Sequence, residues 1–154
     1  MIGSFFSQYG IKLIATFFGA AGFCLFFHVK KDKLVYAVFG SMLSILTLFI
    51  CESLGVNLLL QNMIAAVIAT LYAEMIARVV KAPATVFIIS GIIPLTPGSA
   101  LYYTMSAMVD GDMPVAEIMA KNTGTIALGI ALGIVLVSVI FYQLTHRNVQ
   151  QKSR

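Results

Sequence analysis

Five long apolar runs, separated by short polar segments, dominate the pattern of the chain. They cover residues 13–29, 34–53, 58–80, 84–108 and 120–144. A helix needs about 20 apolar residues to cross a bilayer, and each run meets or nearly meets that length. Lipid admits only helices and closed barrels, and the runs lack the strict alternation of barrel strands. The pattern therefore predicts an all-α polytopic membrane protein with five transmembrane helices, forming a single domain over residues 1–154.

Composition agrees with a chain that lies in lipid. Hydrophobic residues make up 60% of the 154 residues and charged residues only 10%, whereas an average soluble domain has about 45–50% and 25%. A soluble fold of this length could not bury so much apolar surface. The first residues carry no basic charge, so we expect residues 1–11 to be an interfacial lead-in and not a cleavable signal.

The distribution of Lys and Arg predicts the orientation of the spans. Of the ten basic residues, two would lie on one side of the membrane, Lys12 and Lys121. With five spans, the other eight share the opposite side: Lys30, Lys31, Lys33, Arg78, Lys81, Arg147, Lys152 and Arg154. Because basic loops stay in the cytoplasm, we expect the N-terminus outside and the C-terminus inside. The same clusters are short and lie between apolar runs, so the net charge of +4 does not indicate a nucleic-acid partner.

The fourth run carries helix breakers at its centre. Pro94 and Pro97 each remove a backbone donor and clash with the carbonyl four residues earlier, and Gly98 adds flexibility. We therefore expect the fourth transmembrane helix to be broken at Pro94, Pro97 and Gly98, near the bilayer midplane. Backbone groups freed at that depth need a partner from protein, water or a ligand. A kink that only shapes helix packing is the alternative.

A substrate site is predicted at this break. With Ser99 as N-cap, the second half-helix would direct backbone N–H groups near Leu101 and Tyr102 toward an anion such as a carboxylate. Broken helices whose ends meet substrate at the midplane recur in transporters. Asn122 opens the fifth run and could line the same path, with ordinary helix contacts as the alternative. The candidate substrate-binding residues are Pro94, Thr96, Pro97, Gly98, Ser99, Tyr102 and Asn122.

Two further features of the apolar runs carry predictions. Glu74 lies at hydrocarbon depth with Arg78 four residues later, and an ionisable group there costs at least ~2.5 kcal/mol unless it is paired or faces water. The two residues are expected to form an ion pair that anchors the helix end, or to take part in coupling or partner contact. Gly129 and Gly133 form a GxxxG match that predicts close helix packing, within the chain or against a partner.

No catalytic, metal or cofactor site is expected. His28 and His146 lie far apart in the sequence, and Cys24 and Cys51 fall inside apolar runs, where cysteine behaves as a small hydrophobe. Two thiols without histidines do not complete a zinc site. No hydrolase, phosphate-binding or dinucleotide-binding motif occurs. An enzyme is therefore not predicted.

The proline–glycine segment also carries a resemblance. Ala82-Pro83, followed by Gly91-Ile92-Ile93-Pro94-Leu95-Thr96-Pro97-Gly98-Ser99 and then Tyr102, resembles the signature of the threonine/serine exporter family. Gly22-Phe23 before the basic first loop and Gly40-Ser41 after it fit the same family, over about residues 22–142. Some members of that family are single chains and others are split into two proteins. This sequence is similar to the small, C-terminal half.

The resemblance implies a function and partners. It implies a subunit of a secondary transporter in the bacterial cytoplasmic membrane that exports small carboxylate-bearing solutes, most simply threonine and serine. A larger subunit of the same family would be its partner, and a second copy of the chain is left open as another. Driving by the proton gradient is also implied. The alternatives are a dicarboxylate (succinate) exporter subunit, or a membrane scaffold or assembly subunit that does not transport.

Overall fold

Six α-helices and one short 3-10 helix make up the described part of the chain. The structure, a computed structural model, describes the backbone of residues 2–152 and the side chains of residues 10–143. No strand occurs over residues 2–152. The elements are α1 (Ile2–Phe26), α2 (Lys31–Ser53), α3 (Leu58–Val79), α4 (Ala84–Ile92), η1 (Ile93–Leu95), α5 (Gly98–Val109) and α6 (Met113–Lys152).

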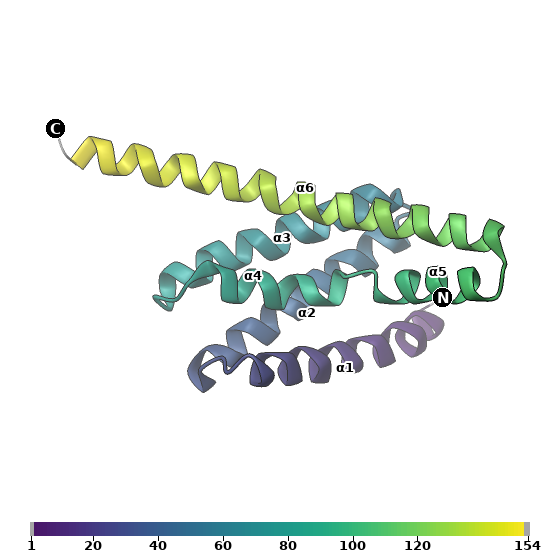
Figure 1. Cartoon of the computed structure of the whole chain (residues 1–154). Helices are drawn as coiled ribbons and strands as arrows, with labels where there is room; N and C mark the ends of the chain where they lie inside the picture. The colour runs from purple at the N-terminus through teal and green to yellow at the C-terminus, as the bar shows by residue number, and fades with distance from the viewer. Residues whose placement is uncertain (1, 153–154) are drawn as a thin grey trace.

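Helix α3 is the centre of the bundle. It packs against α2, α4 and α6, while α5 packs mainly on α6 and α1 on α2. The α1–α2 and α3–α4 loops lie at the same end as the C-terminus, and the α2–α3 and α5–α6 turns lie at the other (Figure 1). The basic segments before α2 and after α3 therefore share one end of the molecule, as the charge pattern predicts. The α5–α6 turn projects beyond the ends of α2 and α3 (Figure 1).

Small residues let the helices approach α3 closely. Ala65, Ala66 and Ala73 on α3 are fully buried. At Gly133 on α6, an added Cβ would lie 2.7 Å from the Met63 carbonyl oxygen of α3. Because lipid tails are as apolar as the side chains, such close backbone packing replaces the hydrophobic effect as the force between helices. The GxxxG stripe therefore packs within the chain.

Over the residues that it describes, the structure contains three or four helices that could cross a membrane, which is fewer than the five that the sequence predicts. Three helices are long and apolar enough to cross a bilayer: α2, α3 and the part of α6 over Met113–Gln143. A fourth crossing results if Ala84–Leu95 and Gly98–Val109, which bend by 50° at the break, count as one span. The described apolar part of α1, Gly10–Phe26, is shorter. The chain is thus an all-helical, multi-pass membrane protein.

In the described part of the chain, four helix ends have a residue with positive φ, and three of them form both bonds of a Schellman motif. At the end of α1, His28 N donates to Leu25 O and Val29 N to Cys24 O, both at 3.0 Å, while His28 takes a positive φ of 55°. The same pair of bonds recurs around Gly55 and Gly111, and around Lys81, Ala82 N donates to Ala77 O at 2.9 Å. All three of these residues also have positive φ. This motif satisfies the last carbonyls of each helix. The expected end of the first helix at Val29 was therefore wrong, and the helix ends at Phe26.

Two helix starts also differ from the sequence expectation. The lead-in expected over residues 1–11 is helical from Ile2, the first residue that the structure describes. Helix α6 begins at Met113 and not at residue 120. The helix starts there because Asp112 Oδ1 accepts a bond from Val115 N at 3.3 Å and Glu117 pairs with Lys121 at 2.6 Å. An N-terminal cap and an i,i+4 ion pair both favour helix at this position.

Candidate functional site

The helical path is interrupted at Pro94 and Pro97. Helix α4 ends at Ile92, η1 makes one 3-10 turn, and α5 starts at Gly98. Pro94 has no N–H, so the carbonyl of Ser90, four residues earlier, loses its helical donor. Ser41 Oγ of α2 donates to that carbonyl at 2.6 Å. A side chain of a neighbouring helix thus satisfies the group that the proline frees.

A second hydroxyl of α2 supports the break in the same way. Ser44 Oγ donates to Gly91 O at 2.6 Å. Beyond it, Ile93 O keeps a backbone donor, Thr96 N at 3.2 Å, and also accepts from Thr96 Oγ1 at 2.6 Å at an exposed position. Buried carbonyls left without a donor would cost about 1–3 kcal/mol each. The buried hydroxyls of Ser41 and Ser44 therefore make the break a stable feature of the fold.

Ser41 and Ser44 support the break through their hydroxyls, a role that the sequence analysis did not assign to them. Both are fully buried, and they lie three residues apart on one face of α2. Their signal in the sequence is two hydroxyls at helical spacing in an apolar run. That signal does not say which carbonyls they would meet, because the partners lie 47–49 residues away.

The expectation that Ser99 caps α5 was wrong. The helix begins at Gly98, Pro97 takes the N-cap position, and no side-chain capping bond forms. Leu101 N donates to Pro97 O at 3.0 Å and Gly98 N to Thr96 O at 2.8 Å. The N–H groups of Ser99 and Ala100 have no acceptor within the helix, as in the first turn of any helix. The positive end of α5 therefore starts two residues earlier than expected.

A cavity of about 420 Å³ lies beside this break. It is lined by residues of α1, α2, α3, η1, α5 and α6, so elements far apart in the sequence meet there. Its polar and charged walls are formed by Lys12, Thr16, Glu52, Gln61, Asn62, Thr96 and Ser99. Its apolar walls are formed by Ala15, Ile45, Leu48, Phe49, Leu58, Pro94, Leu95, Pro97 and Ile126. A concave, mostly apolar space with a few converging polar groups is typical of a small-molecule site.

The cavity brings together part of the predicted substrate-binding set. Pro94, Thr96, Pro97 and Ser99 line it, and Gly98, Tyr102 and Asn122 are not among its described walls. Tyr102 is 66% exposed and its ring meets that of Tyr103 edge to face. Lys12, Thr16, Glu52, Gln61 and Asn62 are wall residues that the predicted set did not contain.

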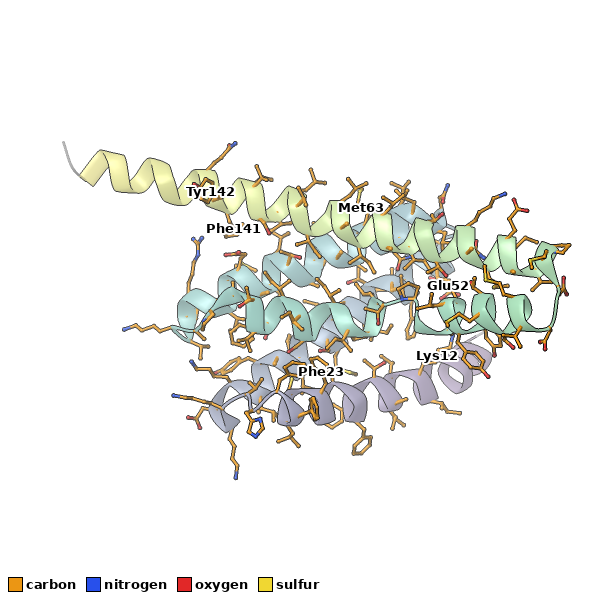
Figure 2. All side chains as sticks on the ribbon, viewed as in Figure 1. Lys12, Phe23, Glu52, Met63, Phe141 and Tyr142 are labelled. Atoms are coloured by element: carbon orange, nitrogen blue, oxygen red, sulfur yellow. The ribbon has the colours of Figure 1, made fainter. Side chains whose placement is uncertain are left out.

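Glu74 and Arg78 lie far from the cavity on α3. Glu74 Oε2 lies 3.9 Å from Arg78 Nη2, and the Arg78 guanidinium sits 4.7 Å from the centre of the Phe141 ring of α6. Figure 2 shows Phe141 at the end of the bundle opposite Lys12 and Glu52. The predicted ion pair forms, and it is twelve residues, about 18 Å along a helix, from Asn62 in the cavity wall.

Comparison with known proteins gives one match. A family model described as threonine/serine exporter, ThrE, matches residues 12–140. This range covers most of the chain and includes the break and all the cavity walls. No curated protein and no solved structure matches the chain.

Proposed function

The chain belongs to the threonine/serine exporter family, and from this premise we propose that it is one subunit of a secondary transporter that exports threonine and serine. The family is one of transporters and not of enzymes. Membership of a transporter family and the apolar helices of this chain both indicate that the protein acts in a membrane. The identities of the substrate, the coupling ion and the partner subunit are parts of our proposal.

The cavity beside the break is the observation that carries the proposal. A transporter needs a polar site at membrane depth that is reached through irregular backbone lining a cavity. The segment Thr96–Pro97 and the start of α5 supply such backbone, and the cavity walls supply hydroxyls and charges for a polar solute. In this proposal Pro94, Pro97 and Gly98 shape the site, and Thr96 and Ser99 contact the substrate.

The proposal also covers the membrane arrangement. Helix α1 and the bent pair α4–α5 would each cross the bilayer, which gives five spans with the N-terminus outside and the C-terminus in the cytoplasm of a bacterial cell. A larger subunit of the same family would supply the rest of the transport path, because this chain lines the cavity without closing it. Glu74 would pair with Arg78 as an anchor or take part in coupling.

Efflux of labelled threonine, serine and succinate from cells expressing both subunits tests the proposal. Ser99→Leu adds bulk to the cavity wall, and overpacking of about 1–3 kcal/mol corresponds to a loss of affinity of about 5- to 150-fold. Ser53→Leu makes the same substitution at an exposed position of α2 outside the cavity and should leave efflux unchanged. Expression of each variant is checked in the membrane fraction.

The outcomes separate the competing functions. Efflux of threonine and serine that falls for Ser99→Leu alone supports the proposal. Efflux of succinate in place of threonine and serine would assign the chain to the dicarboxylate alternative. Absence of efflux for all three solutes, with both subunits in the membrane, would favour the scaffold or assembly role.

A further inference from the structure

One basic and one acidic side chain line the cavity beside the break. Lys12 lies on α1 and Glu52 on α2. The Lys12 ammonium is 5.7 Å from the centre of the buried Phe49 ring, and Glu52 follows Phe49 by three residues on the same face of α2. Figure 2 shows the two labelled side chains at the same end of the bundle, near the gap between η1 and α5.

Helical spacing places both charges on the faces that form the cavity. On α1 the lining residues are Lys12, Ala15 and Thr16, three and four positions apart. On α2 they are Ile45, Leu48, Phe49 and Glu52, which recur at spacings of three and four positions. Residues at these spacings share one face of a helix. The charges therefore belong to the walls of the cavity and not to the opposite, outward faces of α1 and α2.

Several of the remaining polar walls are already engaged with the backbone. Thr16 Oγ1 donates to Lys12 O at 2.8 Å, Thr96 Oγ1 to Ile93 O at 2.6 Å, and Asn62 Nδ2 to Leu58 O at 2.8 Å. These groups keep acceptor capacity but contribute no net charge. Strong, charge-assisted recognition in this cavity must therefore come from Lys12 and Glu52.

We propose that Lys12 and Glu52 are the specificity-determining residues of this cavity, with the Lys12 ammonium binding the carboxylate and the Glu52 carboxylate binding the ammonium of an α-amino-acid zwitterion. The inference rests on the proposed function and names the groups that select its substrate. A zwitterion places one charge opposite each of the two residues. A dicarboxylate would place its second negative charge near Glu52, and like charges brought together in a site disfavour the wrong ligand.

The test uses the complete two-subunit exporter in proteoliposomes and measures inhibition of labelled L-threonine transport by analogues. 2,3-Dihydroxybutanoate carries a hydroxyl in place of the ammonium, and threoninol lacks the carboxylate. Glu52→Gln should weaken the affinity for threonine by about tenfold or more and leave the affinity for 2,3-dihydroxybutanoate unchanged. Lys12→Met should weaken threonine by about the same factor and leave threoninol unchanged.

Matched controls keep the result from reflecting a general loss of charge or fold. Glu117→Gln and Lys121→Met remove an exposed ion pair of α6 that lies outside the cavity walls, and both should leave every affinity unchanged. Lys12→Arg retains the positive charge and should keep the preference for threonine over threoninol. A variant that does not fold would lose all ligands together, which the analogue pattern distinguishes from selective loss.

Three outcomes overturn the inference. If Glu52→Gln and Lys12→Met each lower the affinities for threonine and for both analogues equally, the two residues have a structural role. Unchanged threonine affinity in both variants would remove them from the site, while transport by the unmodified exporter would still support the proposed function. An unmodified exporter that transports no threonine would overturn the proposed function together with this inference.

Discussion

At the scale of single residues, the break depends on hydroxyl groups that replace missing backbone donors. Pro94 removes the N–H that Ser90 O would accept in a regular helix, and Ser41 Oγ takes its place at 2.6 Å. Ser44 does the same for Gly91 O. The irregular backbone that the cavity requires is therefore maintained by two small side chains of another helix.

Ser41→Ala and Ser44→Ala should each lower the free energy of unfolding by about 1–3 kcal/mol, because each leaves a buried carbonyl oxygen without a donor. Thermal unfolding of the purified protein in detergent measures the loss. Ser53→Ala is the matched control on the same helix, since its Oγ bonds Ile50 O at an exposed position. Equal stability of all three variants would contradict the role of Ser41 and Ser44.

In the background of Pro94→Ala, the substitution Ser41→Ala should lower the free energy of unfolding by less than it does in the unmodified protein. Residue 94 would then carry an N–H that can donate to Ser90 O, so the Ser41 hydroxyl is no longer the sole donor available. A double-mutant cycle on unfolding measures this coupling, expected at about 0.5–3 kcal/mol for groups sharing one partner. Additive effects of the two substitutions would show that proline and serine act independently.

At the scale of helices, α6 is held against α3 by glycines. An added Cβ at Gly129 would lie 2.6 Å from Leu59 O, and one at Gly133 would lie 2.7 Å from both Met63 O and the Ala66 Cβ. These neighbours are backbone or a residue on a packed helix, so neither can turn aside. The α3–α6 contact therefore needs glycine at both positions.

Gly129→Ala and Gly133→Ala should each destabilise the protein by about 1–3 kcal/mol, because overpacking forces the two helices apart. Gly124→Ala on the same helix has no atom within 4 Å of the added Cβ. It should be neutral or stabilising by up to about 1 kcal/mol from helix propensity alone. Detergent unfolding curves compare the three, and a loss at Gly124 equal to that at Gly133 would contradict the packing argument.

At the scale of the whole molecule, alternating loops lie at opposite ends of the bundle (Figure 1). Lys31 starts α2 at the basic end. At the other end of the bundle, the exposed Leu54 directly follows α2 and the exposed Val109 ends α5. If α4 and α5 form one crossing, Leu54 and Val109 face the same side of the membrane. If they form a re-entrant loop, Val109 faces the side of Lys31.

Labelling of intact cells with a membrane-impermeant maleimide should modify Leu54→Cys and Val109→Cys, and modify Lys31→Cys only after the membrane is opened. The unmodified chain is the control, because Cys24 and Cys51 are buried. Labelling of Val109→Cys together with Lys31→Cys would indicate a re-entrant α4–α5 pair. Labelling of Lys31→Cys alone in intact cells would reverse the proposed orientation.

Prediction from the sequence succeeded where the signal is local. The polar residues between the apolar runs 34–53 and 58–80 located the turn at Gly55, and the spacing of Glu74 and Arg78 predicted their ion pair. It failed at the end of α1, where His28 adopts the positive φ that glycine usually signals. It also missed Lys12 and Glu52 as cavity residues, since 40 residues separate them in the chain.

The sequence by itself determined the class of molecule. The lengths of the apolar runs and the charges of the loops between them indicate membrane helices, and the two prolines locate the break. These properties follow from the free-energy cost of exposing backbone polar groups and charges to lipid. Each segment carries that cost independently of its neighbours in the fold. Only the tertiary structure decided which hydroxyls satisfy the freed carbonyls, that the glycine stripe packs on α3, and that one cation and one carboxylate share a cavity. Those depend on contacts between segments, and hydropathy does not specify how helices pair or rotate against one another in lipid.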